Sequence, residues 1–313
     1  MAKRKPSEVN LLLAVDKPLG ITSHDVVARV RHALDERRVG HAGTLDPLAS
    51  GVMVVGVGQA TRLLGRITQD RKTYLARIAF GFETNTDDAE GEPTRRCEPV
   101  SGLSDPVLAE RVLAGFLGDQ MQVPPAFSAI SVGGVRSYKR ARAGESLELP
   151  ARPVAVYAAD LIAIDEEDGT PAWTVRFDVS KGTYIRSLAR DIGRAAGGAA
   201  HVAGLKRTAS GSISLRACVS LEGLDRQTAL ERCLDPVAAL GLPAFGLSEE
   251  SLADVLVGRP LRVSSLMRRP GAASPVDGSV ALVHAGELRA IASAKGGRVS
   301  MEDVFPQGIG GVE

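Results

Sequence analysis

The sequence has few of the residues that build metal centres or covalent cross-links. Its three cysteines, Cys97, Cys218 and Cys233, are far apart and form no C-x-x-C pair, so neither a zinc site nor a disulfide framework is predicted. Its five histidines contain no H-E-x-x-H motif and no pair spaced four residues apart. We therefore expect a protein without a bound metal.

Long hydrophobic runs are missing as well. No apolar stretch approaches the roughly 20 residues that a membrane-spanning helix needs. The basic N-terminus is followed by an apolar segment, residues 9–15, that is too short for a signal peptide and lacks a small-residue cleavage site. We expect a cytoplasmic protein that does not bind a membrane.

Net charge is also low, at +1, but the charges are unevenly distributed. Residues 176–216 contain eight basic and two acidic side chains, whereas residues 83–110 contain eight acidic and two basic ones. Such segregation is typical of a protein that turns one surface toward phosphates, and it also arises from ordinary solvated faces. Both interpretations stay open on this observation.

The sequence does contain enough apolar material for a sizeable core. With 313 residues, of which 44% are hydrophobic and 24% charged, two domains are expected. Apolar alternation and β-branched residues predict strands at residues 11–15, 51–57, 74–80, 154–164 and 172–179. Helices are predicted from an N-cap at Ser23 to Leu34, from Pro106 to Phe116, and after Thr183. Loops are predicted at residues 37–50, at the acidic surface segment 83–92, and at the irregular segment 120–128.

The composition changes after residue 236. One more helix (242–258) and short strands at 280–284 and 288–292 indicate a small β-rich C-terminal domain. The interleaved strands and helices favour an α+β fold with a mixed, largely antiparallel central sheet and flanking helices. We place the domains at residues 1–240, with a basic insert at about 124–152, and at residues 241–313.

Asp46 lies on one of the predicted loops, within the segment GHAGTLDPLASG at residues 40–51. Glycine and proline constrain the backbone there, and loops held by a rigid scaffold are where catalytic residues concentrate. An aspartate before a proline in such a loop is nevertheless more often a turn former. Its own chemistry does not identify Asp46 as part of a site.

The segment around Asp46 closely resembles the signature loop of the TruB-type tRNA pseudouridine-55 synthases, whose essential residue is the aspartate before the proline. Further blocks match this family in the same order: DKPLGITS (16–23), KTY (72–74), TNTDDAEG (84–91), PPAFSA (124–129), GTYIR (182–186), AHV (200–202) and LKRT (205–208). The matches extend over about two thirds of the chain, from residue 12 to residue 211.

This resemblance implies the pseudouridine synthase fold with a C-terminal PUA-like domain. It also implies that uridine 55 in the T-loop of tRNA is converted to pseudouridine, with Asp46 as the catalytic residue. The reaction breaks the C1′–N1 bond, turns the base and rejoins it through C5. A carboxylate can act there as a nucleophile, at C1′ or at C6, or as a base that helps to form a glycal-like intermediate. No cofactor is required.

The resemblance also gives Asp46 a cationic partner. Arg186 is expected to keep the carboxylate charged. Alternatively, Arg186 contacts phosphate together with Arg190 and Arg194, which share one face of the predicted helix. Like charges at this spacing repel by about a few tenths of a kcal/mol per pair, a cost that an anionic partner would offset.

Other residues match positions that surround the substrate. His41 is expected to fill the gap left when the target base flips out of the RNA. Tyr74 is expected to stack on that base, whereas by pattern alone it is a half-buried strand aromatic. Tyr184 and Leu205 match pocket-lining positions, although Leu205 is nearly as well explained by core packing. Lys17 either organises the wall of the site or meets RNA.

The implied partner is the T-arm stem-loop of tRNA, bound by a monomer without a guide RNA. Candidate phosphate contacts are Arg136, Lys139, Arg140, Arg190, Lys206 and Arg207, with arginines 259, 262, 268 and 269 as further candidates in the C-terminal domain. The alternatives are a guide-RNA-dependent relative of the dyskerin type, which shares the Thr-Leu-Asp-Pro core, and a non-catalytic RNA-binding protein.

Overall fold

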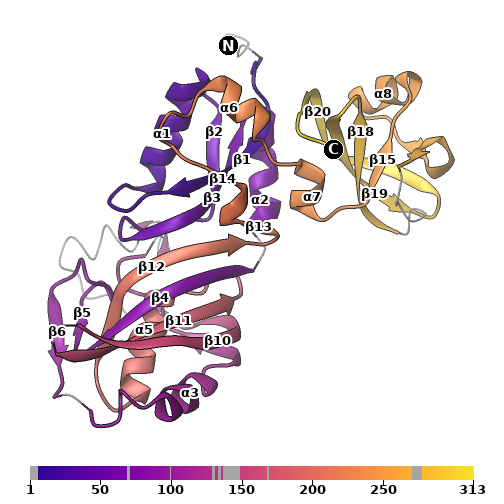
Figure 1. Ribbon diagram of the computed structural model, residues 1–313. Helices are drawn as coiled ribbons and strands as arrows, with labels where there is room; N and C mark the ends of the chain where they lie inside the picture. The colour runs from indigo at the N-terminus through magenta and orange to yellow at the C-terminus, as the bar shows by residue number, and fades with distance from the viewer. Residues whose placement is uncertain are drawn as a thin grey trace.

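The structure is a computed structural model that describes residues 6–68, 71–98, 100–128, 131–132, 135–136, 149–167, 169–269 and 277–313. The chain builds a large mixed sheet and a separate, smaller C-terminal sheet (Figure 1). In the large sheet β1 pairs with β14 and β3 with β12 in parallel, and the other neighbours are antiparallel. The predicted α+β class with a mixed, largely antiparallel sheet is confirmed.

The large sheet has ten strands. Their spatial order is β14 (Cys218–Val219), β1 (Leu11–Lys17), β3 (Ala49–Val57), β12 (Ala200–Ser210), β4 (Lys72–Phe80), β11 (Thr170–Val179), β10 (Arg152–Glu167) and β7 (Gly118–Gln122), with β2 (Val39–Ala42) beside β3 and β13 (Ile213–Ser214) beside β12. Two short hairpins lie outside it: β5 (Phe82–Thr84) with β6 (Pro93–Arg96), and β8 (Ser131–Val132) with β9 (Val135–Arg136).

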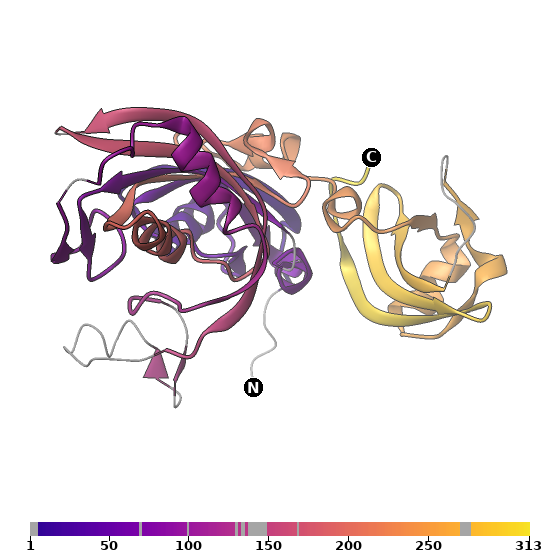
Figure 2. The same cartoon turned by 90° about the horizontal axis from the view of Figure 1, so that it is seen from below.

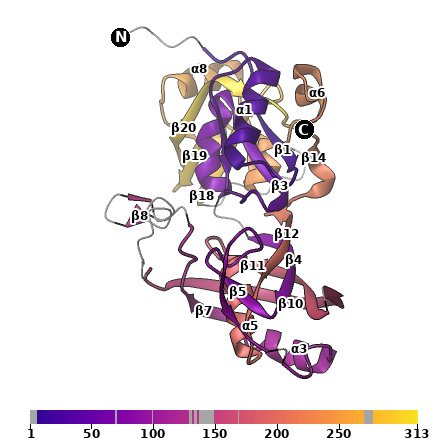
Figure 3. The ribbon, with the colours of Figure 1, turned by 90° about the vertical axis from the view of Figure 1, so that its left-hand side faces the viewer.

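Three amphipathic helices contribute to one hydrophobic cluster with the large sheet. They are α1 (Ser23–Leu34), α3 (Pro106–Ala114) and α5 (Ile185–Ala195). The apolar residues of α5 form one stripe, because Leu188, Ala189 and Ile192 recur at helical spacing and are all buried. Figure 2 shows α5 on the inner side of the curved sheet, and Figures 1 and 3 show α3 and α5 far from the C-terminal domain.

The start of α1 differs from the prediction. The N-cap is Thr22, not Ser23: the Thr22 hydroxyl accepts a hydrogen bond from the Asp25 N–H at 3.1 Å, and the Asp25 carboxylate accepts one from the Thr22 N–H at 2.7 Å. This reciprocal capping box satisfies the first turn of the helix. Ser23 therefore lies inside the helix, with its hydroxyl free for a different partner.

The C-terminal sheet has six strands: β16 (Leu261–Arg262), β20 (Arg298–Ile309), β19 (Glu287–Lys295), β18 (Gly278–His284), β15 (Ala244–Gly246) and β17 (Met267–Arg268). The helix predicted at 242–258 is shorter, because β15 precedes α8 (Glu249–Leu256). Smaller elements are α2 (Leu64–Ile67), α6 (Arg226–Glu231) and α7 (Pro236–Leu240).

The two sheets share a hydrophobic cluster. Leu12 and Val54 on one face of the large sheet belong to the same buried cluster as Phe305 and Ile309 of β20. Both ends of the chain meet there, because the Gly310 N–H donates a hydrogen bond to the Asn10 carbonyl at 3.0 Å. The C-terminal sheet is thus packed against the large sheet and is not merely tethered to it.

Three predicted loops contain more structure than their sequences indicated. Residues 39–42 of the first form β2, which pairs with β3 because its peptide groups extend the edge of that strand. Residues 118–122 form the edge strand β7. The acidic segment 83–92 is only partly a surface loop, because Glu83, Asp87 and Asp88 are buried whereas Glu90 and Glu92 are exposed.

The shared cluster predicts that damage in β20 destabilises the whole protein. We expect Phe305→Ala to lower the free energy of unfolding by about 3–5 kcal/mol, because the ring is fully buried between the two sheets. Chemical denaturation followed by circular dichroism measures this loss. The exposed Met267→Ala in the same domain is the control, with a change of at most about 0.5 kcal/mol. Comparable losses in the two variants would contradict the shared core.

Candidate active site

A pocket of about 500 Å³ opens between α1, the loop after β2, β4 and the start of α5. Six of the predicted site residues line it together: Asp46, Tyr74, Tyr184, Arg186, Leu205 and Arg207. They come from four separate parts of the sequence, so only the fold brings them together. We use "catalytic loop" for residues 43–48, which carry Asp46 from β2 to β3.

The carboxylate of Asp46 forms an ion pair with Arg186. An Oδ2 to Nη2 distance of 3.0 Å separates the two groups, and the Asp46 side chain is 39% exposed whereas that of Arg186 is 6% exposed. The guanidinium also donates to the carbonyls of Thr86, at 2.9 Å, and Phe127, at 3.0 Å, and pairs with Asp88 at 3.3 Å. Arg186 is therefore a fixed, buried cation facing Asp46. The alternative role of a phosphate contact does not fit this burial.

Hydrogen bonds to backbone carbonyl groups hold the catalytic loop and the residue that follows it. Arg207 donates from Nη2 to the Gly43 carbonyl at 3.1 Å, and the Gly20 N–H donates to the Pro47 carbonyl at 2.9 Å. Lys17 donates to the carbonyl of Ala49, where β3 begins, at 2.6 Å. The loop thus enters β3 with its backbone held on both sides of Asp46.

Lys17 and Arg207 are both fully inside the protein. Burial lowers the pKa of Lys17, and the negative charge of Asp46 acts in the opposite direction. Of the two roles left open for Lys17, the structure supports organising the wall of the site. Arg207 is 1% exposed and also donates to the Val52 carbonyl at 2.7 Å, so its prediction as a phosphate contact is wrong.

His41 lies on β2, opposite Val55. The sequence placed it on the same loop as Asp46, and the structure places it on the strand that precedes that loop. Its ring makes an edge contact with His24, which lines the pocket, at 6.1 Å between centroids. Burial lowers the pKa of His41, and His24 and Arg207 lower it further. His41 is therefore an uncharged side chain beside the pocket.

The two pocket tyrosines come from different walls. Tyr74 is on β4, opposite Phe177 of β11, with 9% of its surface exposed. Tyr184 is the residue before α5, and burial raises the pKa of its phenol. Both tyrosines line the pocket together with Leu205, and the three give it aromatic and apolar surface beside the Asp46–Arg186 pair.

The arginines of α5 are paired with the acidic segment. Arg190 binds Asp87 at 2.8 Å and Asp191 at 2.9 Å, and its side chain is 11% exposed. Arg194 binds Glu83 at 2.7 Å. The opposite charges that are segregated in the sequence therefore meet inside the protein. The prediction of Arg190 as a phosphate contact is wrong because internal carboxylates occupy it.

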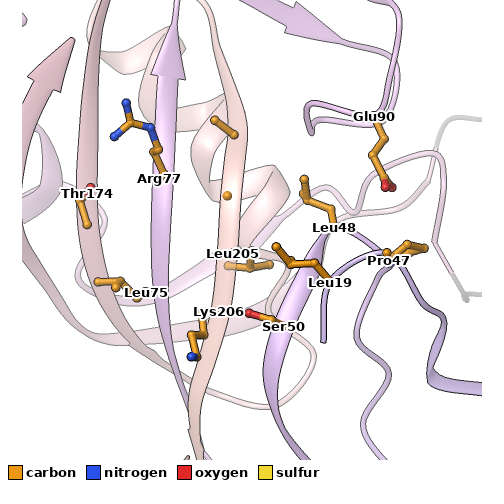
Figure 4. A pocket seen from close by; sticks show the side chains of 13 residues that line it. Leu19, Pro47, Leu48, Ser50, Leu75, Arg77, Glu90, Thr174, Leu205 and Lys206 are labelled. Atoms are coloured by element: carbon orange, nitrogen blue, oxygen red, sulfur yellow. The ribbon is translucent and has the colours of Figure 1, made fainter. Parts of the chain in front are cut away.

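The remaining phosphate candidates lie elsewhere. Lys139 and Arg140 are outside the described residues, and of Arg136 only the backbone, in β9, is described. Lys206 is next to Arg207 on β12, and adjacent strand residues point to opposite faces of a sheet. It lines a second pocket of about 480 Å³ that contains Pro47 and Leu48 but not Asp46 (Figure 4).

Several residues of the site were not predicted as such. Asp88 holds Arg186, Ser23 binds the backbone of the catalytic loop, and Lys181 is exposed at the rim of the pocket. Among the described residues, no group of His, Cys, Asp and Glu is arranged to hold a metal. None of the helices in that part of the chain is long and apolar enough to span a membrane.

Comparisons with known proteins identify the family of this chain. The family model of the TruB family pseudouridylate synthase N-terminal domain matches residues 31–185, and that of the tRNA pseudouridylate synthase B C-terminal domain matches residues 186–240. Curated proteins named tRNA pseudouridine synthase B from Corynebacterium aurimucosum, Mycobacteroides abscessus and Paenarthrobacter aurescens are 42%, 43% and 42% identical to the chain. These alignments cover 89%, 87% and 95% of this chain and 93%, 91% and 95% of those proteins. The chain belongs to the TruB family of pseudouridylate synthases, enzymes that isomerise uridine in RNA to pseudouridine.

Two solved structures share the fold. One is an H/ACA RNP bound to a substrate RNA containing 2′-deoxyuridine, with a TM-score of 0.67 and 25% identity over 94% of this chain and 84% of that chain. The other is an archaeal box H/ACA sRNP Nop10–Cbf5 complex, with a TM-score of 0.66 and 26% identity over 96% of this chain and 89% of that chain. At this coverage, the likeness includes the C-terminal sheet.

The pairing of Arg190 predicts a loss of stability when it is replaced. We expect Arg190→Gln to lower the free energy of unfolding by about 3–5 kcal/mol, because Asp87 then stays buried without its cation. Burial raises the pKa of Asp87 to about 6, and Arg190 opposes this shift, so the substitution raises that pKa further. Because this pKa is higher in the folded protein than in the unfolded chain, binding of the proton by Asp87 stabilises the folded protein at low pH. That contribution to the free energy of unfolding is lost as the pH rises through the folded pKa. The loss should therefore be larger at pH 8 than at pH 5 in urea denaturation.

Arg194→Gln is the matched control. Its side chain is 52% exposed, and its partner Glu83 keeps a second ion pair with Arg95 at 2.9 Å. We expect a loss below about 1 kcal/mol. Equal losses in the two variants, or a loss at Arg190 that does not depend on pH, would rule out the buried pair as the cause.

Proposed function

We propose that the enzyme converts uridine 55 in the T-loop of tRNA to pseudouridine, with Asp46 as the catalytic carboxylate. The observation that carries this proposal is the pairing of a half-exposed Asp46 with a buried Arg186 at the wall of a pocket. The arginine places a positive charge against the carboxylate, and the exposure of Asp46 leaves carboxylate oxygen accessible to substrate. The tRNA substrate is supported by the names of relatives that are 42–43% identical.

The carboxylate acts on a uridine that has left the RNA stack. Breaking the C1′–N1 bond needs a nucleophile or a base within reach of the ribose or the uracil ring, and Asp46 is the carboxylate that lines the pocket. After the bond breaks, the base turns and rejoins through C5. The apolar side of the pocket gives the detached uracil a surface on which to turn without leaving.

Flipping the base costs about a few kcal/mol, which the pocket must offset. Tyr74 stacks on the base, an interaction worth about 1–3 kcal/mol, while Tyr184 and Leu205 close the pocket around it. His41, uncharged and beside the pocket, occupies the gap that the base leaves in the RNA.

We further propose that the enzyme works as a monomer in the cytoplasm and without a guide RNA. In this proposal the C-terminal sheet is a PUA-like RNA-binding domain, and its exposed arginines 259, 262 and 268 contact the stem. The basic insert, which lies mostly outside the described residues, grips the T-arm. The identity to tRNA-named relatives is higher than the identity to the H/ACA structures, which favours independent action.

The proposal is tested with in vitro transcribed tRNA and the purified chain alone, followed by chemical mapping of pseudouridine. We expect product at position 55 with wild type. Asp46→Asn should lower turnover by at least about 10³-fold. Its tRNA affinity should stay within about 3-fold, because phosphate contacts dominate binding.

Absence of product without a guide RNA would exclude independent action. Product at another uridine would exclude the assigned position. An Asp46→Asn variant as active as wild type would remove Asp46 from the mechanism.

Lys181 is proposed as a phosphate contact in place of the buried arginines. It is exposed at the rim of the pocket, four residues before α5 begins. We expect Lys181→Ala to weaken tRNA binding and to reduce the slope of log K against log salt by about 1. Arg190→Gln, measured in parallel at a temperature where it is folded, should leave that slope unchanged. The reverse pattern would show that Arg190 and not Lys181 meets the RNA.

A further inference from the structure

The catalytic loop has a pocket on each of its two sides. Asp46 lines the pocket of about 500 Å³, whereas the next two residues, Pro47 and Leu48, line the pocket of about 480 Å³. In Figure 4, Pro47 and Leu48 lie near Leu19, to the right of the strand that carries Leu205. Leu45 belongs to the core cluster and Leu48 packs against it, whereas Asp46 itself lines a cavity. The direction of the Asp46 side chain therefore depends on how the backbone beside it is held.

One side chain holds the residue directly before Asp46 through both of its backbone groups. The Ser23 hydroxyl accepts a hydrogen bond from the Leu45 N–H at 2.9 Å and donates one to the Leu45 carbonyl at 2.8 Å. Ser23 is 2% exposed and Leu45 is 4% exposed, so water does not compete for these bonds. Such bonds are stronger in a buried environment than at the surface.

The geometry of α1 gives Ser23 this role. Thr22 caps the helix, so the Ser23 hydroxyl is not needed for the helix itself. Lys17 and Arg207 also hold the loop, but their side chains can only donate hydrogen bonds. A hydroxyl is both a donor and an acceptor, and it can therefore hold both backbone groups of Leu45 and not only one carbonyl.

We propose that Ser23 is a positioning residue for Asp46. By fixing Leu45 it sets where the next residue directs its carboxylate between Arg186 and the bound uridine. This inference rests on the proposed role of Asp46 in turnover. A misplacement of about 1 Å at a reacting group costs about 100-fold in rate, even when it originates away from the chemistry. Binding of the tRNA, which depends on phosphate contacts over a wide surface, should not depend on Ser23.

The test compares four variants of the full-length enzyme on in vitro transcribed tRNA. Ser23→Ala should lower kcat by about 10- to 100-fold and leave the Kd for tRNA within about 3-fold. Ser23→Thr and Ser23→Val have nearly the same shape and differ in the hydroxyl. We expect at least about a 10-fold higher kcat for the threonine variant. Their melting temperatures are measured so that kcat is compared where each is folded.

Ser251→Ala is the matched control. Ser251 is a serine of α8 that is 6% exposed, and its hydroxyl accepts a hydrogen bond from Ser248 at 3.2 Å, far from the catalytic loop. The same atoms are removed as in Ser23→Ala, and kcat should stay at the wild-type value. This separates a positioning role from a general effect of losing a buried hydroxyl.

The outcomes distinguish this inference from the proposed function. A wild type that does not modify tRNA overturns both. An active wild type with equal kcat for the threonine and valine variants overturns the positioning role alone. Parallel changes of kcat and Kd in Ser23→Ala, or a similar loss of kcat in Ser251→Ala, also overturn it. A fall in kcat that is confined to the variants without a hydroxyl supports it.

Discussion

The site depends on one buried cation. Arg186 is held by backbone carbonyls of two loops and by the carboxylate of Asp88, and its remaining direction is toward Asp46. A buried charge is tolerated only when it is paired and its hydrogen-bond donors are satisfied. This requirement ties α5, the acidic segment and the segment around Phe127 to one another. Of the two carboxylates that pair with Arg186, Asp88 is buried and Asp46 is the one that solvent reaches.

The same requirement explains the charged residues around Arg186. Arg190 and Arg194 continue the stripe along α5, and the acidic segment supplies Asp87 and Glu83 to them. Carboxylates about 100 residues away in the sequence offset the repulsion between the arginines. The basic and acidic regions of the sequence thus meet through the arginines of α5, which bind Glu83, Asp87 and Asp88.

The sequence predicts those parts of the fold that have a local pattern. Strands with alternating apolar residues and the stripe of α5 are where they were expected, because burial of one face imposes that period. β2 has no such alternation, and it forms because β3 offers an open edge. The sequence of the acidic segment is typical of an exposed loop. Glu83 and Asp87 are buried because they bind arginines of α5 that are distant in the sequence. For α1, an acid three residues after Thr22 marks the true N-cap, a local signal that was available.

The resemblance to a family points to the candidate site residues, and strand geometry decides which of them are buried. Lys206 and Arg207 are adjacent on β12, so one faces the second pocket and the other turns inward to hold Gly43. A basic dipeptide in a sequence does not show which of its members is buried. Asp46, by contrast, lies on a loop before a strand, as the sequence predicts, and it lines the pocket, whereas its catalytic role stays a prediction.

The shared cluster between the two sheets has a consequence for synthesis on the ribosome. β1 is synthesised long before β20, yet its outward face, with Leu12, is covered by Phe305 and Ile309 of β20. The N-terminal domain therefore folds with an apolar face that stays open to water and to other chains until β20 has been synthesised. A chain that is truncated or stalled before β20 carries that face permanently, which makes it a substrate for chaperones and proteases.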